Sequence, residues 1–151
     1  HYYMDTFNNA PGKHSATIGD ITKSPKASEE VSGRPEGSAL TVECEIDGIS
    51  FMFLNGGPME QFKINGGTSY IVECETQEEI DYFWDNLIKD GGNEVECGWL
   101  KDKFGISWQI TSPEMMKYLG GSNPEGAERA TQAMLRMRKI DLAEMQKAYN
   151  G

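Results

Sequence analysis

The chain has 151 residues, a length typical of one compact domain, and folding would bury about two-thirds of the surface that its unfolded form exposes. Its formal net charge of −10 and its isoelectric point near 4.6 argue against nucleic acid or an anionic membrane surface as a partner. We therefore expect a single domain over residues 1–151 that binds neither.

The cysteines Cys44, Cys74 and Cys97 are odd in number and widely spaced, without a C-x-x-C pair. Neither a disulfide framework nor a zinc ribbon fits this spacing, so reduced thiols are the simplest account. The sequence has no apolar run long enough to cross a bilayer and no charged leader followed by an apolar segment. We therefore expect a cytoplasmic protein.

The first third of the chain predicts a helix, a strand and a hairpin. Aromatic residues at helical spacing predict a short helix that ends near residues 8–12, and residues 15–22 alternate as in a strand. Residues 23–37, rich in Ser, Lys, Glu, Pro and Gly, predict a mobile loop. Residues 40–46 and 49–53 then alternate apolar and polar side chains on either side of Asp47-Gly48, which is typical of a tight hairpin turn.

A Gly-rich connection over residues 59–66 leads to a predicted strand at residues 68–74 and a capped helix. The Thr76 side chain can accept a hydrogen bond from a helix N–H while Glu79 reaches back toward the preceding chain. Apolar residues recur at helical spacing from Ile80 to Ile88, and Gly91-Gly92 ends the pattern. We expect this apolar stripe to belong to the core.

A closing hairpin over residues 97–111 indicates how the chain is organised. Its second strand alternates an apolar face of Ile106, Trp108 and Ile110 with a polar face of Ser107, Gln109 and Thr111. The segment DGISFMF at residues 47–53 matches FGISWQI at residues 104–110, which aligns Phe51 with Trp108 and Met52 with Gln109. The sequence therefore predicts a two-fold internal repeat.

Helices are predicted after the repeat. Residues 113–119 form a short helix, Asn123 before Pro124 caps a helix over residues 125–138, and Asp141 with Glu144 caps a final helix. Their apolar stripes favour packing on the sheet or on a second subunit. A flexible Met-lined binding groove is the alternative.

The order of elements and the matched hairpins resemble the vicinal oxygen chelate superfamily of glyoxalase I, bleomycin-resistance proteins and ring-cleaving dioxygenases. The resemblance to its PhnB-like branch, labelled 3-demethylubiquinone-9 3-methyltransferase-like, is more specific. It rests on LNGGP at residues 54–58, CETQEE at residues 74–79, CGWLKDKFGISWQI at residues 97–110, and the C-terminal AMLRMRKIDLAEMQKAYNG.

The resemblance implies an α+β fold of two βαβββ units, residues 1–57 and 58–111, that form a curved mixed sheet, followed by a helical tail at residues 112–151. The first strand of this pattern is missing from the sequence, and we expect it to be disordered, removed or supplied by a partner chain. Because half-domains commonly pair across subunits in the superfamily, we expect a homodimer, with or without exchanged elements.

Metal-using members of the superfamily place a carboxylate after the aromatic residue of each repeated hairpin, and commonly a His, Gln or Glu on the first strand of a unit. The corresponding residues here are Met52, Gln109 and, on the first strand of the second half, Gly67 or Thr68. A thioether, an amide and a Thr hydroxyl are poor ligands for a divalent metal. We therefore expect neither a catalytic metal nor another cofactor.

The strand parity places polar side chains of both halves around a cleft that suits a small polar organic ligand. The expected ligand-binding residues are Thr41, Glu43, Met52, Asn55, Trp99, Ser107 and Gln109. Glu43, Gln109 and Cys97 are catalytic candidates: Glu43 as a general base if burial raises its pKa, and Cys97 as a nucleophile if a neighbour lowers its pKa. The simpler alternatives are an outer, solvated position for Glu43 and a small buried thiol for Cys97.

Three functions stay open, and we favour the first. It is a metal-independent protein that binds a small polar molecule. The second is an enzyme, either a metal-dependent lyase, isomerase or dioxygenase, or the methyltransferase of the family label, although no strand leads into a Gly-rich turn for an adenosyl cofactor. The third is an interaction protein whose tail dimerises it and whose cleft is vestigial.

Overall fold

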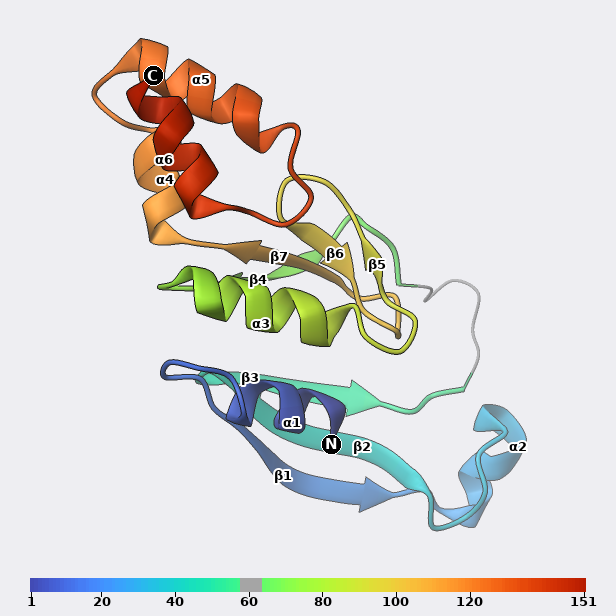
Figure 1. Cartoon of the computed structure of the whole chain (residues 1–151). Coiled ribbons are helices and arrows are strands. Elements are labelled where there is room, and N and C mark those ends of the chain that lie inside the picture. Colours follow the sequence, from blue (N-terminus) through green and yellow to red (C-terminus); the bar gives the residue numbers. More distant parts are fainter. Residues whose placement is uncertain (58–63) are drawn as a thin grey trace. The chain divides into compact units, whose positions relative to one another are not determined.

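The computed structural model describes residues 1–57 and 64–151, so most of the predicted connection, residues 59–63, lies outside the described residues. The chain divides into two compact units, residues 1–63 and 64–151 (Figure 1). Each unit contains its own sheet with a helix on one face. The α+β class predicted from the sequence is confirmed.

The first unit has a helix followed by antiparallel strands. α1 (Tyr2–Asn8) precedes β1 (Ala16–Lys23), β2 (Ala39–Ile46) and β3 (Ile49–Leu54), which lie in the order β1-β2-β3. The helix covers one sheet face, where Phe7 and Cys44 are buried and the Tyr3 and Phe53 rings stack with centroids 6.1 Å apart. The predicted helix, strand and hairpin are all present.

The segment between β1 and β2 is more regular than the loop that its composition predicts. It contains the 3-10 turn η1 (Lys26–Ser28) and the one-turn helix α2 (Glu29–Ser32). The hydroxyls of Ser24 and Ser28 lie 2.7 Å apart, and the Ser32 hydroxyl donates to the Ser28 carbonyl at 2.8 Å. Composition detects the lack of apolar core residues here, but it does not detect local serine hydrogen bonds.

The second unit has the complete βαβββ order. β4 (Ser69–Glu73), α3 (Gln77–Leu87), β5 (Asn93–Glu94), β6 (Trp99–Lys101) and β7 (Ser107–Thr111) form a sheet in the order β4-β7-β6-β5, with β4 parallel to β7. α3 lies along one face of this sheet (Figure 1). The buried apolar side chains are Val72, Ile80, Phe83, Trp84, Leu87, Leu100, Trp108 and Ile110.

The start of α3 confirms the predicted capping box with one difference. The Thr76 hydroxyl accepts the Glu79 N–H at 3.2 Å, and the Glu79 carboxylate accepts the N–H of Glu75 at 2.6 Å. The side chain of Glu79 thus reaches one residue further back than the standard motif. The cap leaves Glu79 buried at the connection from β4 to α3.

The structure also confirms the two-fold repeat. β3 and β7 are each the last strand of their unit, and each pairs antiparallel with the strand before it. The turn glycines Gly48 and Gly105 have φ angles of 78° and 85°, in the left-handed region that glycine adopts readily. The connections differ in length, with two residues between β2 and β3 and five between β6 and β7, but a left-handed glycine comes shortly before the last strand in both units.

The tail contains α4 (Pro113–Leu119), α5 (Pro124–Met134) and α6 (Leu142–Asn150), which pack together in the second unit (Figure 1). α5 ends before the predicted Arg138 because the chain turns to pair with the segment before β6. The Met137 and Arg138 carbonyls accept the N–H groups of Cys97 and Gly98 at 2.8 and 2.7 Å. These bonds replace the helical hydrogen bonds that those carbonyls would otherwise receive.

Gln77 joins the tail to α3. Its amide group donates to the Ile140 carbonyl and accepts the N–H of Leu142, both at 2.9 Å. Beside it, the Lys139 ammonium lies 2.9 Å from the Asp81 carboxylate. Partial burial raises the pKa of Asp81, but hydrogen bonds from Lys139 and Gln77 outweigh it and hold that pKa below its usual value.

Asp102 shapes the hairpin between β6 and β7. Its side chain is 2% exposed and accepts the N–H groups of Phe104 at 2.9 Å and Ile106 at 3.0 Å, and the indole N–H of Trp108 at 2.9 Å. Asp102 is not among the residues that the sequence marks as important, because an Asp before a Gly-containing turn is ordinary at a surface. Only the folded hairpin brings the Trp108 indole to it.

We predict that Asp102→Ala destabilises the protein by about 2–4 kcal/mol, because it leaves several buried donors without their charged acceptor. Urea unfolding followed by circular dichroism measures the change. The matched control is Asp20→Ala, which removes an exposed carboxylate from β1 and should change the unfolding free energy by less than roughly 0.5 kcal/mol. Equal losses in the two variants would contradict the structural role of Asp102.

We also predict that Gln77→Ala loosens the tail, because the Ile140 carbonyl and the Leu142 N–H lose their partner. Amide hydrogen exchange should become faster in residues 139–150 and stay unchanged in β1–β3. Gln77→Glu keeps an acceptor for Leu142 but places a carboxylate oxygen beside the Ile140 carbonyl and the Asp81 carboxylate, so it should speed exchange at least as much. Uniformly faster exchange in both units would contradict a local role of Gln77 in holding the tail against α3.

Candidate functional site

In the first unit, predicted site residues share the sheet face opposite α1. The register pairs Glu43 with Met52 and Thr41 with Leu54, so these side chains point to the same side. A shallow hollow of about 370 Å³ lies on this face. Its lining is formed by Thr17, Gly19, Glu43, Cys44, Glu45, Ser50, Phe51 and Met52.

The hollow lies beside an irregularity in β1. The register between β1 and β2 shifts between Ile18 and Ile21, so that Gly19 and Asp20 together face the position of Glu43. Such a bulge interrupts the ladder, and Gly19 adds no side chain above the sheet. The gap beside Glu43 therefore follows from the backbone, and sequence alternation alone did not reveal it.

The chemistry of this hollow differs from that of a general-base site. Glu43 is exposed and Met52 is 63% exposed, so the burial that would make Glu43 a base is absent from the structure. Burial raises the pKa of the Cys44 thiol, which keeps it protonated at neutral pH and unsuited to nucleophilic attack. The hollow can supply carboxylate and hydroxyl groups for binding.

In the second unit, the other predicted residues share the sheet face opposite α3. Trp99 pairs with Gln109 across β6 and β7, and Ile71 of β4 pairs with Gln109 on its other side. The Gln109 amide donates to the Ser69 hydroxyl at 2.9 Å, and Ser107 is buried on the same face. The structure thus brings Trp99, Ser107 and Gln109 together within this unit.

Two predicted residues have other surroundings. Asn55 closes the end of the β2–β3 hairpin, where its side chain donates to the Ala39 carbonyl at 3.1 Å and its N–H to the Leu40 carbonyl at 2.8 Å. Cys97 lies in the turn before β6 with a left-handed φ of 57°, and it is half-buried. The Cys97 N–H donates to the Met137 carbonyl, so this residue holds the turn against the tail.

The lining of the hollow also includes Thr17, Gly19 and Ser50, which are not among the ligand-binding residues expected from the sequence. Ser50 could have been found, because the repeat aligns it with Ser107. Thr17 lies beside the hollow because the register pairs it with Glu45, and Gly19 lies there because of the bulge in β1. Both depend on long-range strand pairing, which a local pattern does not encode.

The residues at the superfamily's metal positions do not fit a divalent metal. Met52 offers a thioether, the Gln109 amide is bonded to Ser69, and Thr68 offers only a hydroxyl before β4. Within residues 1–57 and 64–151, no three His, Cys, Asp or Glu side chains gather in a way that could hold a metal ion.

The connection from β4 to α3 also does not fit an adenosyl cofactor. Residues 74–76 contain no glycine, and the side chains of Thr76 and Glu79 already take the N–H groups around the start of the helix. A nucleotide site at such a connection needs free N–H groups and close approach of the ligand to the backbone.

In the part of the chain that the structure describes, no helix has the length and apolar character needed to cross a bilayer.

Comparison with known proteins places these units in a family. A family model described as 3-demethylubiquinone-9 3-methyltransferase matches residues 1–111. A PhnB protein from Bacillus cereus, provisionally described as a 3-demethylubiquinone-9 3-methyltransferase, is 27% identical, with a TM-score of 0.58 over 74% of this chain and 85% of that chain. Protein PA1353 from Pseudomonas aeruginosa is 14% identical, with a TM-score of 0.49 over 74% of this chain and 84% of its own.

No curated protein matches the chain. The matched residues run from α1 to the end of β7 and include the repeated hairpins of both units. The chain therefore belongs to the PhnB-like family labelled 3-demethylubiquinone-9 3-methyltransferase.

Proposed function

We propose that this protein binds a small polar organic molecule on the open face of the β1–β3 sheet, without a catalytic metal. The observation that carries the proposal is the hollow on β1–β3, where exposed carboxylates lie beside hydroxyls and the apolar side chain of Met52. Its volume of about 370 Å³ lies in the lower part of the range typical of small-molecule sites. We expect Thr41 to contribute at the edge of this surface.

The lining suggests the chemistry of the ligand. The carboxylates of Glu43 and Glu45 favour hydroxyl donors or a positive charge, and the Met52 side chain adapts to an apolar part of the molecule. In the second unit, Gln109, paired with Ser69, supplies an amide beside the half-buried Trp99. The carboxylates and hydroxyls of the hollow suit recognition of a neutral or cationic polar molecule better than activation of water.

The label of the matched family favours a second candidate, an enzyme. It would catalyse methyl transfer or, as elsewhere in the superfamily, a lyase, isomerase or dioxygenase reaction. The donor set at Met52 and Gln109 and the capped start of α3 give this candidate less support. We further propose that the protein is cytoplasmic, because its three cysteines are not joined by disulfides and suit a reducing compartment, and that it forms a homodimer.

Elemental analysis tests the metal-free part of the proposal. The purified protein, dialysed without chelator and measured by inductively coupled plasma mass spectrometry, should contain well under one metal ion per chain. The expectation follows from the thioether and amide donors, which bind divalent ions weakly. Near-stoichiometric iron, manganese, nickel or zinc would overturn it and would favour the enzyme.

Ligand binding is tested by a thermal-shift screen of neutral, cationic and anionic polar metabolites. We predict that the hits are neutral or cationic and that Glu43→Gln with Glu45→Gln weakens their binding at least about tenfold, because both carboxylates line the hollow. Isothermal titration calorimetry measures the affinities. Glu36→Gln, which removes an exposed carboxylate elsewhere in the same unit, is the matched control.

Two outcomes would count against binding on this face. The first is a ligand whose affinity is the same in the Glu43 and Glu45 variant as in the Glu36 control. The second is conversion of a bound ligand into a methylated product in the presence of S-adenosylmethionine, which would establish the second candidate.

A further inference from the structure

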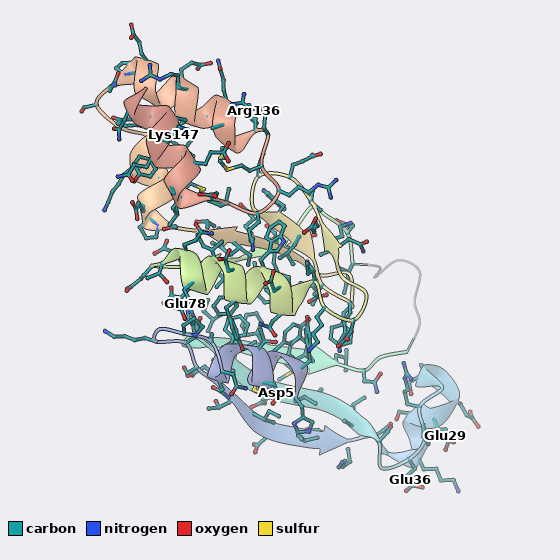
Figure 2. All side chains as sticks on the ribbon, viewed as in Figure 1. Asp5, Glu29, Glu36, Glu78, Arg136 and Lys147 are labelled. Carbon is teal, nitrogen blue, oxygen red and sulfur yellow. The ribbon has the colours of Figure 1, made fainter. Side chains whose placement is uncertain are left out.

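A groove of about 750 Å³ lies between α5 and α6, outside the residues that the family model matches. Its apolar floor includes Ala133, Ala143 and Ala148, its basic residues include Arg136 and Lys147 (Figure 2), and its acidic residues are Asp141 and Glu144. Small side chains on facing helices leave room between the helix backbones. The groove is therefore shaped to take a side chain from outside.

The groove has a fixed frame. At one end the Arg129 guanidinium donates to the carbonyls of Ala148 at 2.9 Å and Tyr149 at 2.8 Å, which ties α5 to the last turn of α6. At the other end the Asp141 carboxylate accepts the N–H of Glu144 at 2.9 Å as the cap of α6. The side chains of Arg129 and Asp141 are thus already hydrogen-bonded within the tail.

Arg136 and Lys147 differ from Arg129 and Asp141 in their surroundings. Both are exposed, and within the described residues neither side chain forms an ion pair with a carboxylate. With Arg129 they make three basic residues in the lining against two acidic ones, Asp141 and Glu144, so the groove has an excess of one positive charge. Such a surface fits an acidic segment that carries an apolar side chain.

The distribution of charge along the chain supports an acidic occupant. Residues 112–151 contain six Lys and Arg against five Asp and Glu, a net charge of +1, whereas residues 1–111 contain eight against nineteen, a net charge of −11. Two copies of this chain therefore repel each other through most of their length. The tail is the region that can receive an acidic surface of a second copy.

α2 supplies a matching segment. Val31 is 89% exposed, the highest value among the exposed large hydrophobic side chains of the described residues, and Glu29 and Glu30 beside it are also exposed. Figure 2 labels Glu29 on this short helix. The serine hydrogen bonds around Ser28 and Ser32 hold α2 in shape, so little order needs to be gained on binding.

We propose that the α5–α6 groove binds α2 of a second copy of this chain, with Val31 on the alanine floor and Glu29 and Glu30 facing Arg136 and Lys147. This contact specifies a surface for the homodimer proposed above and is independent of the ligand site on β1–β3. One such contact is smaller than the roughly 1,200–2,000 Å² of a stable interface. The association is therefore weak and depends on concentration.

A charge exchange tests the proposal by sedimentation equilibrium. The groove variant carries Arg136→Glu and Lys147→Glu, and the α2 variant carries Glu29→Lys and Glu30→Lys. Each variant alone should self-associate at least about tenfold more weakly than the wild type, because like charges then face each other. An equimolar mixture should recover association, because each acidic α2 meets a basic groove and each basic α2 an acidic groove.

The matched control is Lys89→Glu with Lys117→Glu, which makes the same change in charge at exposed positions outside the groove and should associate like the wild type. Circular dichroism establishes that each variant is folded. Three results would overturn the proposal: a wild type that stays monomeric up to about 1 mM, variants that associate as strongly as the wild type, or a mixture that does not recover association. Each would leave ligand binding on β1–β3 unaffected.

Discussion

The register between the last two strands of each unit is the constraint on which the site depends. Because neighbouring residues of a strand point to opposite faces, pairing Glu43 with Met52 and Trp99 with Gln109 decides which side chains face the helix and which face outward. A shift of one residue would bury Met52 under α1 and expose its aromatic neighbour. The turn glycines, Gly48 in particular, hold this register.

The elements with local chemical signals could be predicted from the sequence. Thr76 and Asp141 cap α3 and α6 as expected, and the Asp47-Gly48 turn joins β2 and β3. Elements that depend on distant partners were predicted less well. α5 ends early because Met137 bonds to the chain before β6, and α2 forms through serine hydrogen bonds within a segment whose composition indicates a loop.

The residues of the candidate site show the same difference between local signals and dependence on distant partners. Alternation placed Thr41 and Glu43 on one face of their sheet and Gln109 on the open face of the other, and the register agrees. It did not show the bulge at Gly19, which lies beside the hollow, or the bond from Asn55 to the Ala39 carbonyl, which uses the Asn55 amide within the hairpin. Long-range pairing creates both features.

The repeated hairpins have diverged in chemistry while keeping their geometry. At equivalent positions Met52 is exposed beside two carboxylates, whereas Gln109 bonds to Ser69 and lies beside Trp99. A divalent metal prefers carboxylate or imidazole ligands, which neither position supplies. Each open sheet face therefore has its own chemistry: the hollow on β1–β3 offers carboxylates to a hydroxyl donor or a positive charge, whereas the open face of β4–β7 offers an amide beside an indole.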